Sequence, residues 1–168
     1  ISVSEADIKK FASVIFEMKK PVKSLLIKTI NEKYGVIVYH PVTDNLSESI
    51  PVVKALINHV SASQFPYIWL WPNVDAGSDQ ISQLLRKSRE NISSFANNVR
   101  FVRSYTPVDY LRVLKSSDHV IGNSSSFIRE CSHLAIPALI VGERQRSREI
   151  DQNVRLISYE QIIEGNLS

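Results

Sequence analysis

The sequence predicts an α/β fold built on a doubly wound parallel sheet of the Rossmann-like type. Short apolar runs alternate with longer segments of helical periodicity along most of the 168 residues. The first run, Val-Ile-Val-Tyr, and the last, Ala-Leu-Ile-Val, are continuously apolar. Strands of this kind are typically buried on both faces by helices, as in a parallel sheet, and short links favour right-handed strand–helix–strand connections.

Five strands and four intervening helices are expected in chain order. The strands are residues 35–39, 67–71, 99–102, 119–121 and 137–141. The helices are residues 47–61, 78–89, 107–116 and 126–133, followed by a short final helix at 159–164. The third helix has the clearest beginning, because Thr106 caps it, Pro107 occupies its first turn and Asp109 complements its dipole.

The chain is expected to contain one domain and a lead-in. Residues 34–168 form the domain, while residues 1–33 hold a helix at 5–18 and a linker from a missing upstream domain. An ordinary packing helix at 5–18 is an equally good interpretation. Ile1 stands where a start Met would be expected and no signal region follows it, which favours an excised fragment of a cytoplasmic protein.

Composition excludes several classes of partner. Hydrophobic residues make up 43% of the chain and charged residues 22%, as in globular proteins with a full core. The apolar runs are too short to span a membrane. The net charge is only +3, and no basic stripe with interleaved aromatic residues is visible, so no nucleic-acid partner is expected.

No cofactor or metal is expected either. The chain lacks both the G-x-G-x-x-G fingerprint of dinucleotide sites and the P-loop of many ATPases. Its histidines and its one cysteine, Cys131, are not spaced as zinc ligands. Cys131 is expected to act as a small hydrophobic residue on the inner face of a helix, and His59, His119 and His133 are given structural roles.

The stretch Gly122-Asn123-Ser124-Ser125-Ser126 predicts an anion site. A strand ends at a glycine, three hydroxyls follow and an amphipathic helix begins, which directs N–H groups, hydroxyl donors and the positive helix end to one place. The alternative is a plain helix cap, for which one hydroxyl is enough. Arg144, Arg146 and Arg148 follow the next strand and would lie beside the same anion, so a phosphate site is favoured.

Polar residues also follow the first two strands. Pro41 forces His40 into an extended conformation at the tip of the first strand, where an imidazole can donate to a phosphate or act as an acid or base. A structural histidine is the alternative. Asn73 and Asp75 follow the second strand and are weaker candidates, since a turn with Ser78 as helix cap explains most of that link.

The remaining candidates indicate a nucleoside. Ser104 and Tyr105 follow the third strand and offer backbone groups and an aromatic ring to a base. Glu130 lies one helical turn past Ser126, where a carboxylate repels phosphate unless it accepts hydrogen bonds from sugar hydroxyls. A solvated helix residue is the alternative for Glu130. Phosphate on the serines with ribose on the carboxylate describes a nucleoside diphosphate.

Together these residues resemble the UDP-N-acetylglucosamine 2-epimerases, and most closely the hydrolysing branch that feeds sialic acid synthesis. The resemblance covers about residues 34–157. It is carried by four motifs, which are His40-Pro41-Val42-Thr43, residues 72–78, Gly122–Ser126 with Arg129-Glu130, and Gly142-x-Arg144-Gln145. It implies a GT-B-like architecture of two Rossmann-like domains, of which this chain is similar to the carboxyl-terminal, nucleotide-binding one.

The resemblance also implies roles for single residues. Ser124 and Ser125 would hold the diphosphate, Glu130 the ribose, and His40 would assist the departure of UDP. The other expected UDP-binding residues are Asn73, Ser104, Tyr105, Ser126, Arg144 and Arg148, with Ser104 and Tyr105 meeting the uracil through backbone groups. Ser147 stands where the family usually has a glycine, so this loop must bend differently if a positive φ is needed there.

The activity that the resemblance implies is conversion of UDP-N-acetylglucosamine to N-acetylmannosamine and UDP by elimination and hydration, without a cofactor. The catalytic carboxylates would belong to the missing amino-terminal domain, so this chain is expected to bind UDP or a UDP-sugar weakly and not to turn over. The oligomeric state is left open, a homo-oligomer included. Two alternatives are the donor-binding domain of a GT-B glycosyltransferase and a regulatory domain that lost the ligand.

Overall fold

A computed structural model describes residues 33–42, 46–63, 65–72, 78–145 and 147–165. The helix expected at 5–18, almost all of the lead-in and Asn73 lie outside these residues. Within the described ranges, the helices are too short or too polar to cross a membrane.

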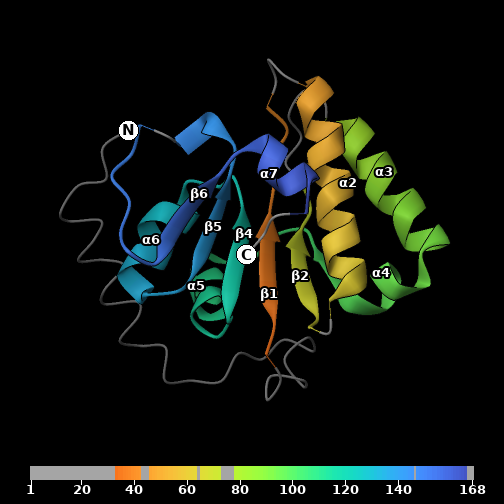
Figure 1. The fold of residues 1–168 in the computed structure, drawn as a ribbon. Coiled ribbons are helices and arrows are strands. Elements are labelled where there is room, and N and C mark those ends of the chain that lie inside the picture. Colours follow the sequence, from red (N-terminus) through yellow and green to blue (C-terminus); the bar gives the residue numbers. More distant parts are fainter. Residues whose placement is uncertain (1–32, 43–45, 64, 73–77, 146, 166–168) are drawn as a thin grey trace.

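The described chain forms one six-stranded sheet, and every neighbouring pair of strands in it is parallel (Figure 1). The strands are β1 (Gly35–Val38), β2 (Tyr67–Leu70), β3 (Val99–Val102), β4 (His119–Gly122), β5 (Ala138–Val141) and β6 (Val154–Ile157). Their order across the sheet is β3-β2-β1-β4-β5-β6. The direction of winding therefore reverses between β1 and β4, and ligands bind at this point in open α/β sheets.

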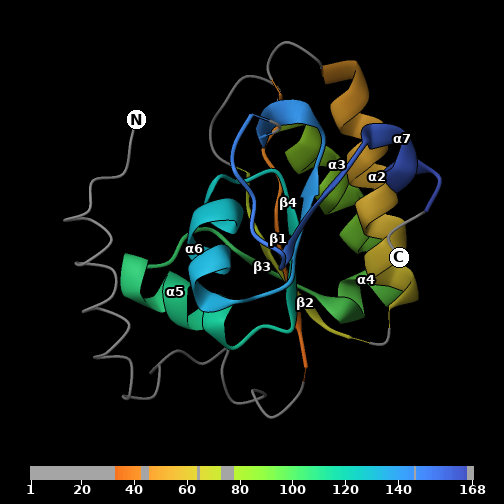
Figure 2. The same ribbon diagram turned by 60° about the vertical axis from the view of Figure 1, so that its left-hand side comes forward.

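Helices cover both faces of the sheet, which confirms the doubly wound fold. They are α2 (Leu46–Ala62), α3 (Ser78–Asn91), α4 (Ser93–Asn98), α5 (Pro107–Lys115), α6 (Ser126–Leu134) and α7 (Tyr159–Ile163). Figure 2 shows α5 and α6 on one face of the sheet, and α2, α3, α4 and α7 on the other. A short 3-10 helix, η2 (Glu143–Gln145), follows β5.

Each face of the sheet has its own hydrophobic core. Ile37 packs with Trp69 and Phe95 on the side of α2 to α4, while its neighbours Val36 and Val38 pack with residues of α5 and α6 on the other side. Alternate residues of β1 thus enter opposite cores, which is why the strand is apolar at every position.

The sequence analysis located five of the six strands but missed β6 and α4. β6 is an edge strand with the sequence Val-Arg-Leu-Ile, in which Arg155 is exposed; β3, at the other edge, has an exposed arginine at the same place, Arg100. α4 follows α3 almost directly, because Ile92 adopts extended dihedral angles (φ −118°, ψ 98°) that break one helical segment into two.

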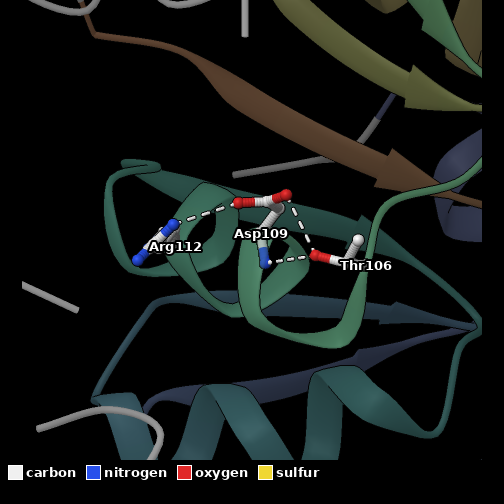
Figure 3. A network of polar contacts seen from close by, with 3 residues as sticks. All are labelled: Thr106, Asp109 and Arg112. Carbon is white, nitrogen blue, oxygen red and sulfur yellow. Dashed lines mark hydrogen bonds and ion pairs between the residues drawn. The ribbon is translucent and has the colours of Figure 1, made fainter. Parts of the chain in front are cut away.

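The expected beginning of α5 is confirmed (Figure 3). The Thr106 hydroxyl accepts a hydrogen bond from the Asp109 N–H at 3.2 Å and donates one to the Asp109 carboxylate at 2.9 Å. Arg112 donates to the same carboxylate at 3.2 Å, one turn further on. The cap therefore fixes where α5 starts and which residues it presents to α6.

Candidate functional site

The links after β1 and β4 meet at the point where the strand order reverses. The Asn123 side chain joins them, because its amide oxygen accepts from the His40 N–H at 2.8 Å and its amide nitrogen donates to the His40 carbonyl at 2.7 Å. Asn123 is fully buried, at 0% exposure. Both backbone groups of His40 are thereby satisfied without a neighbouring strand, and His40 is held beside the serine run.

Gly122 allows the two links to approach this closely. A Cβ atom at this position would lie 1.9 Å from the carbonyl oxygen of Val38, so no side chain fits there. The same carbonyl accepts a hydrogen bond from the Asn123 N–H at 3.1 Å. The glycine is needed because a backbone approaches it, and this closeness puts Asn123 within reach of His40.

The link after β5 joins the same cluster through Gln145. Its side chain is 4% exposed, and its amide nitrogen donates to the Asn123 carbonyl at 3.2 Å. Within the described residues, its amide oxygen is buried without a hydrogen-bond partner. Three links, after β1, β4 and β5, are therefore tied together around one asparagine.

A second contact holds the β1 link from the side of α2. The buried hydroxyl of Ser49 accepts from the Val42 N–H at 3.3 Å and from the Tyr39 hydroxyl at 3.5 Å. His40 lies between this contact and the Asn123 amide. Its half-buried side chain is positioned at the carboxyl edge of the sheet, as the sequence predicts.

The serine run begins α6 without the simple cap that was the alternative interpretation. Ser125 occupies the N-cap position with helical dihedral angles (φ −65°, ψ −22°) and makes no side-chain cap hydrogen bond. The Ser126 N–H has only a long bond of 3.4 Å to the Ser124 hydroxyl. Among the described residues, the N–H groups of Ser124 and Ser125 make no hydrogen bond, so they are left as donors at the positive end of the helix.

Glu130 is not the solvated residue of the alternative interpretation. One carboxylate oxygen, Oε2, is buried and has no hydrogen-bond partner within the described part of the chain. Burial raises the pKa of this carboxyl above its ordinary value, and Arg129 only partly offsets the effect. A buried acceptor of this kind suits a ligand that donates hydroxyl hydrogen bonds.

The expected binding residues after β3, Ser104 and Tyr105, differ in exposure. Ser104 is exposed after β3, whereas Tyr105 turns inward and packs against the core beneath α5 and α6. The pKa of Tyr105 is raised by burial. Of the two residues, only Ser104 therefore faces outward with its side chain.

The three arginines that were expected beside the anion begin within η2, which contains Arg144. Arg148 is exposed, and its N–H donates to the Gln145 carbonyl at 3.1 Å. The side chain of Arg144 and all of Arg146 lie outside the described residues. Gly142, which directly follows β5, has a positive φ of 80°.

The amino ends of the strands contain two of the three histidines that were given structural roles, His59 and His119. Nε2 of His59 and Nε2 of His119 lie 2.8 and 2.9 Å from the Tyr67 hydroxyl, and burial lowers the pKa of both imidazoles. A cavity of about 610 Å³ adjoins them at the amino ends of β2 and β4. Cys131 is fully buried, as expected, and burial raises its pKa to about 12.

The sequence analysis assigned no role to Asn123, Gln145 or Tyr110. Asn123 and Gln145 stand within the quoted motifs, and their position directly after glycine-ended strands was an available signal. Tyr110 gave no local signal: it lies on α5, and its hydroxyl is 2.6 Å from that of Ser126. In the described ranges, no group of three or more His, Cys, Asp or Glu residues could hold a metal ion.

Comparison with protein families gives a match along almost the whole chain. The family model described as UDP-N-acetylglucosamine 2-epimerase matches residues 6–166. A UDP-N-acetylglucosamine 2-epimerase of Neisseria meningitidis serogroup B is 30% identical over 77% of this chain and 33% of its own length. A UDP-N,N'-diacetylbacillosamine 2-epimerase (hydrolyzing) of Legionella pneumophila is 27% identical over 80% of this chain and 37% of its own length. The chain spans about a third of the length of these relatives.

Solved structures show the same fold at low sequence identity. A Staphylococcus aureus MnaA–UDP structure aligns with a TM-score of 0.65, at 12% identity, over 91% of this chain and 40% of its own. The N. meningitidis epimerase bound to UDP-GlcNAc aligns with a TM-score of 0.62, at 14% identity, over 95% and 42%. An Escherichia coli heptosyltransferase, WaaC with ADP, aligns with 0.57, at 13% identity, over 99% and 58%. The fold is thus the Rossmann-like half of a GT-B-like architecture.

Removing the Asn123 amide is expected to weaken the whole edge. Asn123→Ala removes both hydrogen bonds from this amide to the His40 backbone, and we expect the free energy of unfolding to fall by roughly 2–3 kcal/mol in urea denaturation. Asn91→Ala is the matched control, since Asn91 is exposed and makes one bond, to the Lys87 carbonyl at 2.8 Å. Equal losses in both variants would contradict the prediction.

Replacing the buried carboxyl is expected to stabilise the protein at neutral pH. The folded chain raises the pKa of Glu130, so ionisation above the ordinary value opposes folding. Glu130→Gln should therefore unfold at higher urea than the wild type at about pH 7, and the gap should close below about pH 4, where the carboxyl is protonated in both states.

The control for this measurement is Glu160→Gln. A hydrogen bond from Ser158 lowers the pKa of the exposed Glu160 carboxyl, so this replacement should act in the opposite direction at neutral pH. A loss of stability in Glu130→Gln at neutral pH would show that Glu130 already has a partner in the free protein.

Proposed function

This chain belongs to the UDP-N-acetylglucosamine 2-epimerase family, and on that premise we propose that residues 34–168 are the carboxyl-terminal, UDP-binding domain of a hydrolysing member. Residues 1–33 would lead in from an upstream domain. The proposal is carried by one observation, the uncapped serine run at the start of α6 followed one turn later by the buried carboxylate of Glu130. Donors and an acceptor lie together there, at the reversal of the strand order.

The diphosphate would bind at the start of α6. The N–H groups of Ser124 and Ser125 and the serine hydroxyls donate to its oxygens, and the helix end adds a favourable field. Arg144 and Arg148, after the neighbouring strand, would supply guanidinium groups that match phosphate geometry. The two solved relatives that hold UDP and UDP-GlcNAc support this choice of ligand.

The nucleoside would occupy the side of the site near Glu130. Two ribose hydroxyls can donate to the carboxylate, which gives the buried Oε2 the partner it lacks among the described residues. The backbone at Ser104 and Tyr105 would meet the uracil, and Asn73 would line the same pocket. Glu130 therefore selects a ligand that carries donors as well as an anion.

The proposed reaction has two phases. In the first, a carboxylate of the upstream domain removes the C2 proton, the bond from C1 to the diphosphate oxygen breaks, and UDP leaves a 2-acetamidoglucal. In the second, water adds across the double bond, with hydroxyl at C1 and hydrogen at C2, to give N-acetylmannosamine. Negative charge grows on the leaving diphosphate, so fixed donors aimed at it lower the barrier.

His40 would assist the first phase. The Asn123 amide fixes its backbone beside the serine loop, which puts an imidazole near the diphosphate that departs. An imidazole can donate a hydrogen bond or a proton to the leaving oxygen near neutral pH. Two relatives whose names include "hydrolyzing" support hydrolysis as the outcome. Because the proton-moving carboxylates would lie upstream, the chain alone is expected to be inactive.

A second candidate is the donor-binding domain of a glycosyltransferase. The likeness to the heptosyltransferase, which extends over 99% of this chain, favours it. Both candidates share the fold and a nucleotide-sugar ligand. They differ in whether water or an acceptor sugar receives the glycosyl unit, so only the product separates them.

The proposed function predicts that this chain binds UDP. On titration with UDP, backbone amide NMR shifts should move at residues 122–130 and 142–148. Ser124→Ala combined with Ser125→Ala should weaken binding roughly tenfold or more, because hydrogen bonds to a charged group are lost. Ser116→Ala combined with Ser117→Ala, a serine pair at the opposite end of β4, should bind UDP as the wild type does. No response to UDP would favour a regulatory domain that lost its ligand.

The reaction itself is tested on the full-length protein that contains this chain. With UDP-N-acetylglucosamine we expect free N-acetylmannosamine and UDP, detected by chromatography, and no turnover by residues 1–168 alone. His40→Ala in the full-length protein should lower kcat by about 10²-fold or more, while UDP affinity changes much less. Transfer of the sugar to an acceptor would establish the glycosyltransferase instead.

A further inference from the structure

A tyrosine on α5 extends the hydrogen bonds of the serine run. The Tyr110 hydroxyl lies 2.6 Å from the Ser126 hydroxyl, which lies 2.9 Å from the Ser124 hydroxyl. These three groups form a chain that runs from the interior between α5 and α6 to the proposed diphosphate site. Tyr110 packs against the core on that face, so its end of the chain is the buried end.

The direction of the hydrogen bonds along this chain decides what Ser124 offers to a ligand. Three hydroxyls carry three protons, and the two bonds between them use two. If Tyr110 donates to Ser126 and Ser126 donates to Ser124, the remaining proton belongs to Ser124 and can be donated to a phosphate. If the direction is reversed, Ser124 has only lone pairs left, and these repel an anion.

Two features favour the first direction. A phenol is a better donor and a poorer acceptor than an aliphatic hydroxyl, because its ring withdraws charge from the oxygen. The Ser124 hydroxyl is also an acceptor for the Ser126 N–H, at 3.4 Å, so its lone pairs face Ser126. Burial raises the pKa of Tyr110, and the neighbouring Cys131 and Glu130 add to the effect, which keeps the phenol protonated and able to donate.

The position of Tyr110 is fixed independently of the serine run. It follows Asp109 directly, and the Thr106 cap together with the Asp109–Arg112 ion pair sets the first turn of α5 (Figure 3). The ring then packs against the core shared by α5 and α6. The tyrosine is thus a rigid donor against which the serine hydroxyls are oriented.

We propose that Tyr110 is a positioning residue of the UDP site, which donates through Ser126 so that Ser124 presents its proton to the diphosphate. Tyr110 itself need not touch the ligand. The inference rests on the proposed UDP-binding function, and it adds a residue outside the four sequence motifs. It concerns the diphosphate alone, because the uracil and ribose contacts lie elsewhere in the site.

The test compares UDP with uridine, both followed by amide NMR shifts on the 168-residue chain. Tyr110→Phe removes only the hydroxyl, so UDP should bind roughly threefold to tenfold more weakly while uridine affinity stays the same. Ser126→Ala should weaken UDP binding to a similar extent. Because the two residues act through one chain, the double variant should be no weaker than Ser126→Ala alone.

The matched control is Tyr34→Phe. The Tyr34 hydroxyl donates to the Val113 carbonyl at 2.6 Å within the same core, so its removal lowers stability without reaching the serine run. The inference is overturned if Tyr110→Phe binds UDP within twofold of the wild type, or if it loses UDP and uridine affinity equally. In either case, UDP binding by the wild type still supports the proposed function. Absence of UDP binding by the wild type overturns both.

Discussion

Asn123 uses both ends of its amide to hold the backbone of His40, and the arrangement of the carboxyl edge depends on this pair of hydrogen bonds. At the reversal of a doubly wound sheet, the chains leaving the two central strands turn toward opposite faces, so their backbone groups lack ladder partners. A fully buried amide supplies one donor and one acceptor to the same residue. It can do so only because Gly122 leaves room for the Val38 carbonyl. Gly122 and Asn123, which are adjacent in the sequence, are therefore both needed for the contact with the His40 backbone.

The same edge is held from three directions, and this makes it rigid enough to position a ligand. Ser49 bonds the link after β1 from the side of α2, Gln145 bonds Asn123 from the link after β5, and Tyr110 bonds Ser126 from α5. The contacts of Gln145 and Tyr110 join residues that are 22 and 16 positions apart in the sequence. Donors that are fixed before a ligand arrives need no reorganisation when negative charge develops, which is the condition for electrostatic stabilisation of a leaving group.

Local signals made the sheet predictable, and the absence of such signals explains what was missed. The inner strands are buried on both faces, so their apolar runs are unbroken. The signal for the Thr106 cap consists of four consecutive residues, 106–109. β3 and β6 are the two edge strands, and each carries an arginine outward, Arg100 and Arg155; β3 was predicted and β6 was not. His40, the serine run and Glu130 were proposed as site residues because their residue types suit a phosphate and a sugar. The roles of Asn123 and Tyr110 depend instead on which strands are neighbours and which helices share a face of the sheet. A short segment of sequence does not reveal either of these.

The hydrogen-bond donors and the acceptor that lack partners at this edge, among the described residues, restrict the kind of ligand that fits it. Among the described residues, the N–H groups of Ser124 and Ser125 are donors without acceptors, and Oε2 of Glu130 is a buried acceptor without a donor. An inorganic anion would satisfy the first set and worsen the second, since a second negative charge would face the carboxylate. A neutral sugar would satisfy the carboxylate but leave the positive end of α6 without an anion. A nucleoside diphosphate carries an anionic acceptor and hydroxyl donors a few ångströms apart, so it satisfies both sets at once. Under the proposed function, the Glu130 carboxylate would be the group that distinguishes a nucleotide from phosphate alone.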